Sequence, residues 1–132
     1  MTDRTKEIQE AECFFFHGHR DALPLYEKLA ACIFARIPEV TVKVQKTQIT
    51  FANRHVFACA SFRPARKAKD RPNPFLTVTF GLAYRLEASR VDVATEPYPN
   101  RWTHHVTIGS VDDIDEELLR WIQEAAAFSA AK

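Results

Sequence analysis

The sequence predicts a single α+β domain, with N-terminal and C-terminal helices packed on one face of a mostly antiparallel sheet of about five or six strands. Helical periodicity occurs near both ends of the chain, and strand-like alternation fills the middle. No helix lies between successive strands, as a parallel sheet would require. Because 132 residues suffice for one domain with its own core, we treat residues 1–132 as one domain.

Two helices are expected near the N-terminus. Residues 3–13 have the composition of a short, mostly polar helix, which forms an N-terminal extension. The next helix should begin with Asp21 as its cap and Pro24 in its first turn, and Pro38 should end it. The apolar residues of this second helix repeat at helical spacing and are Leu25, Tyr26, Leu29, Ile33, Phe34 and Ile37.

Six segments have the pattern of strands. Residues 39–45 and 47–52 alternate apolar and polar side chains and join tightly near Lys46, which predicts a hairpin. Residues 55–62 are apolar on both sides of their alternation, so we expect a central strand. The other expected strands are residues 75–80, 90–95 and 101–110.

The alternation divides the strand residues between two faces. The face toward the helices should carry Ile49, Phe51, Leu76, Val78, Phe80, Val91, Val93, Val106 and Ile108. We expect the opposite face to be open to water or to a partner. It is rich in threonine and should carry Gln48, Thr50, Thr77, Thr79, Asp92, Thr103, His105 and Thr107.

The chain ends in a segment with the pattern of a helix. Ser110 or Asp112 can cap it, and acidic residues crowd its first turn, where the helix dipole favours them. The stripe expected to be buried is Ile114, Leu118, Trp121, Ile122 and Ala125.

Composition and charge exclude several classes of protein. Hydrophobic residues make up 46% and charged residues 27%, as in ordinary globular proteins. The net charge of +1 provides no overall field that would attract nucleic acid or an acidic membrane. The N-terminal segment has only a short apolar run, too short for a signal peptide or a membrane span. We therefore expect a cytoplasmic protein with no membrane contact.

The cysteines and glycines argue against several kinds of chemistry. Cys13, Cys32 and Cys59 contain no CxxC pair, so we expect reduced thiols, with no disulfide framework and no structural zinc site. Only three glycines occur, and none forms a phosphate-binding loop. Cys59 has His55 on its own strand face, about 13 Å away and too far for activation. Catalysis is thus unsupported, and no cofactor is expected.

Two adjacent histidines lie in the last expected strand. Successive strand side chains point to opposite faces, so His104 and His105 cannot chelate one metal ion together. His104 shares a face with Val106, which predicts a hydrogen-bonded histidine at the rim of the core. His105 shares the polar face with Thr103 and Thr107, where it is either solvated or part of a site.

The stretch HGH places two more histidines close together. His17 and His19 could converge with His55 or His105 on a metal ion, but no carboxylate lies at a ligand-like interval nearby. We interpret the stretch as a glycine-broken link between helices and expect no metal site.

Residues 63–74 form a basic loop punctuated by prolines. Clustered cations of this kind bind phosphate, so the loop is the best nucleic-acid feature of the chain, although it has no aromatic residue for base stacking. The alternative is a solvated hairpin loop. Its cations are Arg63, Arg66, Lys67, Lys69 and Arg71.

Three stretches together resemble a known family. KTQITFANRHVFACASF at residues 46–62, HHVTIGSVDDIDEELLRWIQEA at 104–125 and LPLYEKL upstream are similar to the family called domain of unknown function 5655. The resemblance covers about residues 14–129. It implies a small α+β module and a binding role, with no catalytic assignment. It also implies a variable segment at residues 63–74, which weakens the nucleic-acid interpretation.

The leading hypothesis is a non-catalytic module that binds a small ligand or a protein partner on the polar sheet face. A hydrolase or transferase that acts on a phosphorylated or nucleotide substrate, with a histidine as general base, is the alternative from another class. A homodimer formed through the same face and a nucleic-acid accessory domain also stay open. The residues assigned to the ligand site are His105, His104, Thr79, Lys46, Arg54 and Arg90.

Overall fold

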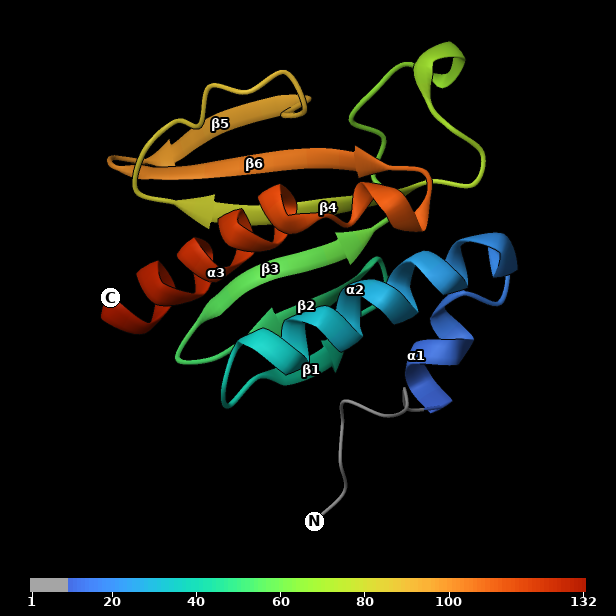
Figure 1. The fold of residues 1–132 in the computed structure, drawn as a ribbon, viewed down its shortest axis with the longest axis horizontal. Coiled ribbons are helices and arrows are strands. Elements are labelled where there is room, and N and C mark those ends of the chain that lie inside the picture. The colour runs from blue at the N-terminus through green and yellow to red at the C-terminus, as the bar shows by residue number, and fades with distance from the viewer. Residues whose placement is uncertain (1–9) are drawn as a thin grey trace.

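The computed structural model describes residues 10–132, which form a six-stranded sheet with helices near both ends of the chain (Figure 1). The strand order is β1-β2-β3-β4-β6-β5, and every neighbouring pair is antiparallel. The predicted α+β class is therefore confirmed. The strands are β1 (Thr41–Val44), β2 (Gln48–Ala52), β3 (Val56–Ser61), β4 (Leu76–Leu82), β5 (Val93–Tyr98) and β6 (Arg101–Ile108).

Two long helices, α2 (Leu23–Arg36) and α3 (Glu116–Ala131), lie side by side over one face of the sheet (Figure 1). They bury most of the apolar stripes that the helical periodicity predicts, because each presents one apolar side to the sheet, whereas Phe34 and Trp121 are only partly buried. The aromatic ring of Trp121 on α3 stacks on Phe80 of β4, with 6.0 Å between ring centroids. Seven of the nine sheet residues predicted to face the helices are at most 1% exposed: Ile49, Phe51, Leu76, Val78, Phe80, Val106 and Ile108.

The short helix α1 (Glu10–Phe15) lies near the edge strand β1 (Figure 1). The predicted helix at residues 3–13 overlaps it, and residues 3–9 of that prediction lie outside the described part of the chain. Glu12 is only 1% exposed and accepts a hydrogen bond from the hydroxyl of Tyr26 on α2. The ring of Phe16 packs on the same tyrosine, with centroids 5.1 Å apart. A buried polar contact and an aromatic contact thus hold α1 against α2.

The predicted helix caps are wrong in two places. Asp21 belongs to a 3-10 turn, Arg20–Ala22, and α2 begins after Ala22 with no side-chain cap. Ser110 precedes another 3-10 turn, Val111–Asp113, and the cap of α3 is Asp115, whose carboxylate accepts a hydrogen bond from the amide of Leu118 at 3.0 Å. In each case a 3-10 turn takes up the residues before the helix, so the helix begins later than the first capping residue in the sequence.

Two predictions about the sheet faces also need correction. Val93 pairs with His105 across β5 and β6, so it lies on the polar face, and its exposed fraction is 36%. Val91 lies before β5, directly after a turn that its amide closes by donating to the carbonyl of Ala88, so it does not take part in the alternation of the strand. The polar face is also less open than predicted, because Thr50, Thr77, His105 and Thr107 are buried.

The basic loop accounts for part of that cover. The hydroxyl of Thr77 donates to the carbonyl of Arg63 at 2.6 Å, and Arg66 pairs with Asp92 at 2.8 Å. Pro72 packs so closely on Gly109 that a Cβ added there would lie 2.4 Å from the proline ring. These contacts hold part of residues 63–74 against the end of the sheet, so the alternative of a fully solvated hairpin loop is wrong for Arg66 and Pro72.

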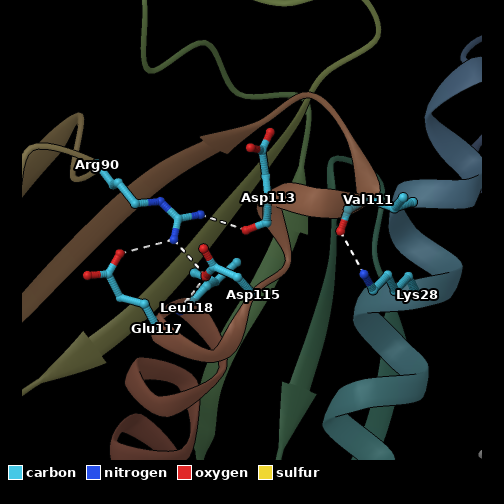
Figure 2. Close-up of polar contacts among 7 residues, drawn as sticks. All are labelled: Lys28, Arg90, Val111, Asp113, Asp115, Glu117 and Leu118. Carbon is cyan, nitrogen blue, oxygen red and sulfur yellow. Dashed lines mark hydrogen bonds and ion pairs between the residues drawn. The ribbon is translucent and has the colours of Figure 1, made fainter.

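Arg90 joins the segment before β5 to the start of α3 (Figure 2). Its guanidinium donates to the carboxylates of Asp115 and Glu117 at 2.7 and 3.1 Å and to the carbonyl of Asp113 at 2.6 Å. Lys28 of α2 donates to the carbonyl of Val111 in the adjacent turn at 2.8 Å. The turn before α3 is therefore held by cations from two other parts of the chain.

We expect Arg90→Ala to lower the free energy of unfolding by about 1 to 2 kcal/mol, because it removes several charge-assisted hydrogen bonds from a guanidinium that is only 25% exposed. Arg120→Ala is the matched control, since Arg120 is 76% exposed and makes one ion pair within its own helix. It should cost less than about 0.5 kcal/mol. Urea denaturation measures both, and equal losses would contradict the role assigned to Arg90.

Candidate functional site

A hollow of about 1150 Å³ opens on the face of the sheet that α2 and α3 leave uncovered. Side chains of β3, β4 and β6 form its floor. The β1–β2 turn and β5 border it on either side, and residues of α1 lie at one end. The lining residues that carry polar groups are His19, Gln45, Lys46, Thr47, Gln48, Cys59, Ser61, Arg63, Thr79, Thr95, Thr103 and His105.

A row of three polar side chains crosses the floor of the hollow. The strand register places Cys59 of β3 opposite Thr79 of β4, and Thr79 opposite His105 of β6. Neighbouring strands lie about 4.8 Å apart, and directly paired residues project from the same face. The hydroxyl of Thr79 and Nδ1 of His105 are 2.8 Å apart and share a hydrogen bond. Three groups from separate parts of the sequence therefore lie next to one another.

His105 is only 6% exposed although it borders the hollow. Burial lowers the pKa of its imidazole, the positive charge of Arg63 and the neighbouring His104 lower it further, and the carboxylate of Asp92 opposes them. Within residues 10–132, Nε2 of the ring makes no hydrogen bond. The ring is thus a neutral imidazole that can exchange a proton with a bound molecule.

Cys59 is half-buried and carries a free thiol. Burial raises its pKa, whereas hydrogen bonding by Thr79 and the charge of Arg63 act in the opposite direction. The thiol also donates a hydrogen bond to the side-chain oxygen of Gln48 at 3.7 Å. At neutral pH the group is therefore a protonated thiol in contact with other polar groups of the floor.

Aromatic rings and cations lie around the mouth of the hollow. Phe62 stacks against Phe15 with centroids 5.8 Å apart and against His19 with centroids 3.9 Å apart. Lys46 and Arg63 are exposed at the same hollow. Such a lining suits a small molecule that has a flat apolar part and an anionic group.

The hollow brings together some of the residues predicted for the ligand site. His105, Thr79 and Lys46 border it. Arg54 lies in the turn between β2 and β3 and does not border it, and Arg90 is occupied by the carboxylates at the start of α3.

His104 lies on the opposite face of the sheet and is fully buried. Its ring stacks on Phe80 with centroids 5.2 Å apart, and its Nε2 accepts a hydrogen bond from the amide of Leu86 at 2.9 Å. Burial lowers the pKa of His104, the backbone of Phe80 opposes this, and Arg85 lowers the pKa further. The predicted separation of the two histidines onto opposite faces is confirmed.

The cations of the basic loop have different surroundings. Arg63 borders the hollow, Arg66 pairs with Asp92, and the guanidinium of Arg71 lies 5.0 Å from the centroid of the Phe75 ring. Lys67 and Lys69 are exposed. The loop therefore contributes one cation to the hollow.

The histidines suggested as metal ligands do not form a cluster. His17 stacks on Phe14, whereas His55 lies at the β2–β3 turn, where its backbone contacts Ser129 of α3. No group of three or more histidine, cysteine or acidic side chains within residues 10–132 is placed to hold a metal ion. Within the same residues, no helix is both long and apolar enough to cross a membrane.

Sequence reasoning missed the position of Cys59 beside Thr79 and His105. Within its own strand the thiol has only His55 to compare with, because the pairings of β3 with β4 and of β4 with β6 cannot be read from one sequence. Alternation alone places Cys59 and Ser61 on one face of β3, which is the one available signal. It also missed the aromatic border, since Phe15 and Phe62 come from segments that the sequence does not relate.

Comparison with known proteins identifies a family for most of the chain. The model of a family described as "Domain of unknown function (DUF5655)" matches residues 14–129. Searches of curated proteins and of solved structures found no match. The family match agrees with the resemblance seen in the sequence and assigns no activity.

We expect the protein to lose stability as the pH falls through the ordinary histidine range. The folded state holds His104 and His105 with lowered pKa values, so the unfolded chain binds protons at a higher pH than the folded chain does. The stabilisation is complete above about pH 6.5 and declines below it. Urea midpoints at about pH 7.5 and about pH 5.5 measure the loss.

The variant His105→Gln should reduce this pH dependence, and His17→Gln serves as the control because His17 is exposed. The assignment to His105 is contradicted if His105→Gln keeps the full pH dependence of the unmodified protein.

Proposed function

The chain belongs to the DUF5655 family, which is described only as a domain of unknown function, so we propose its function from the geometry of the hollow. We propose that the protein binds a small anionic ligand in this hollow. The observation that carries this proposal is the combination of a buried neutral imidazole, two exposed cations and an aromatic border around one hollow of about 1150 Å³. Small-molecule sites of proteins commonly have this mixture of apolar walls and a few polar groups.

Each part of the hollow supplies a different contact. Lys46 and Arg63 provide positive charge near the mouth, where a carboxylate or phosphate group would keep some of its hydration. Phe62, with the rings beside it, provides an apolar surface for a planar group. Thr79 and His105 provide hydrogen bonds at the floor, which orient the ligand.

The distribution of the cations favours a small ligand over nucleic acid. A nucleic-acid surface needs several cations along the path of the phosphates. In the basic loop, Arg66 pairs with Asp92 and Arg71 lies over the Phe75 ring, which leaves Arg63, Lys67 and Lys69 for such contacts. Arg63 borders the hollow together with Lys46 of the β1–β2 turn, so these two cations can hold one anionic group.

We predict that phenyl phosphate raises the melting temperature more than inorganic phosphate or phenol does, because only phenyl phosphate has both an anionic group and a ring. At a concentration of about ten times Kd, the gain is about 1.4 kcal/mol, or a few degrees. Differential scanning fluorimetry measures the shift. Arg63→Ala and Lys46→Ala should each reduce it.

The matched control is Arg54→Ala, which removes an exposed arginine outside the hollow and should leave the shift unchanged. An equal shift in all three variants, or an equal loss in all three, would contradict binding in the hollow.

A second candidate function is a hydrolase or transferase with a histidine as general base. The supporting observation is that His105 lies in a hollow beside Arg63, with a pKa lowered by burial, so that the base form is present at neutral pH. Release of p-nitrophenol from p-nitrophenyl phosphate tests it. A turnover that is unchanged in His105→Gln would rule out this histidine as the base.

A further inference from the structure

We propose that Cys59 is a covalent attachment site for α,β-unsaturated carbonyl ligands in this hollow, and that Thr79 passes the thiol proton to His105. The inference rests on the proposed binding function, because it concerns the same hollow. It adds a reactive group and a class of ligand that binding alone does not require.

The first argument is the geometry of the strand register. Cys59, Thr79 and His105 are successive neighbours across β3, β4 and β6, and all three border the hollow. Cys59 and His105 are two strands apart, about 9.6 Å, so a direct proton transfer between them is too long. The hydroxyl of Thr79 lies between them and is 2.8 Å from Nδ1 of His105. A hydroxyl both donates and accepts hydrogen bonds, so it can relay one proton.

The second argument comes from His105 itself. The side chain of His105 is only 6% exposed. Nδ1 bonds to Thr79, whereas Nε2 makes no hydrogen bond within residues 10–132 and is not among the buried unpartnered atoms of those residues, so it is accessible from the hollow that the ring borders. A bound molecule in the hollow can therefore hydrogen-bond to Nε2 while Nδ1 keeps its bond to Thr79.

The chemistry needs no co-reactant. Sγ of Cys59 bonds to the β-carbon of the ligand while its proton moves to the hydroxyl of Thr79 and the hydroxyl proton moves to Nδ1 of His105. The electron pair of the carbon–carbon double bond shifts to form an enolate. The proton held by His105 then returns to the α-carbon, either through Thr79 or through water. The product is a thioether, and no leaving group or oxidant is involved.

The surroundings of the Cys59 thiol explain why it needs a proton relay in order to react. Burial disfavours the thiolate, so unassisted Cys59 is a poor nucleophile at neutral pH. The charge of Arg63 and a hydrogen bond from Thr79 both favour the thiolate. In the relay the thiol turns from Gln48 to donate to the hydroxyl of Thr79, and this hydroxyl donates to the neutral His105. A base coupled to the thiol therefore makes it reactive at a pH where burial alone would keep it inert.

The test uses the full chain with Cys13→Ser and Cys32→Ser, which leaves Cys59 as the single thiol. N-ethylmaleimide is the probe, and mass spectrometry of the intact protein follows the rate of addition. We expect Thr79→Val and His105→Gln each to slow the reaction by about tenfold or more. Thr79→Ser should keep the original rate, because it retains the hydroxyl. Equal rates in the serine and valine variants would overturn the proposal.

The pH dependence of the rate tests the relay without substituting Thr79 or His105. With the relay, the rate should be constant between about pH 7 and pH 8.5, because His105, whose pKa is lowered, is already neutral throughout this range. A rate that rises throughout this range in proportion to hydroxide would show unassisted ionisation of the thiol and would overturn the relay. This measurement stays decisive if Thr79→Val does not fold.

A matched pair of probes separates this inference from the proposed binding function. 4-Maleimidobutyrate carries a carboxylate, and N-ethylmaleimide does not. If the hollow binds anions, the charged probe should react faster, and Arg63→Ala should remove its advantage. If the charged probe reacts no faster than the neutral one while Arg63 is present, and Thr79→Val still slows the reaction, anion binding alone is refuted. An advantage retained without any effect of Thr79→Val would refute the relay alone.

Discussion

The antiparallel pairing of β4 with β6 is the constraint on which both the core and the candidate site depend. It places Thr79 opposite His105 and, one residue further on, Phe80 opposite His104. Because strand side chains alternate, a shift of one residue would move His105 into the core and His104 out of it. The apolar face fixes the register, since Val78, Phe80 and Val106 must all face the helices. The polar row across the floor of the hollow is thus positioned by the packing of the opposite face.

The two faces are covered by different means, and this difference creates the hollow. Two long helices, α2 and α3, cover the apolar face with apolar stripes of their own. The polar face receives shorter segments, namely α1 at one edge and the loop of residues 63–74 at one end. Short segments cannot cover a six-stranded sheet completely, so part of the floor stays accessible. His105 is buried by its neighbours in that sheet and still borders open space.

Two adjacent histidines show how the tertiary structure gives one residue type different roles. His104 accepts a hydrogen bond from the backbone and stacks on Phe80, so its surroundings resemble those of a core residue. His105 has a hydroxyl partner and a hollow in front of it. Burial lowers the pKa of both rings. Of the two, only the His105 ring borders the hollow, where a bound ligand can contact it.

Local patterns in the sequence determined the fold class, the strands and the face on which each histidine lies, because alternation and helical spacing depend on near neighbours alone. The same patterns placed Thr79, His105 and Lys46 in the candidate site. They misplaced Val93 and the caps at Asp21 and Ser110, where 3-10 turns and the turn at residues 89–90 interrupt the regular spacing. Only the tertiary structure decided that Arg90 pairs with acids of α3, that Phe15 meets Phe62, and that Cys59 lies two strands from His105. These contacts depend on strand order and on how distant segments pack, and no local spacing in one chain specifies either.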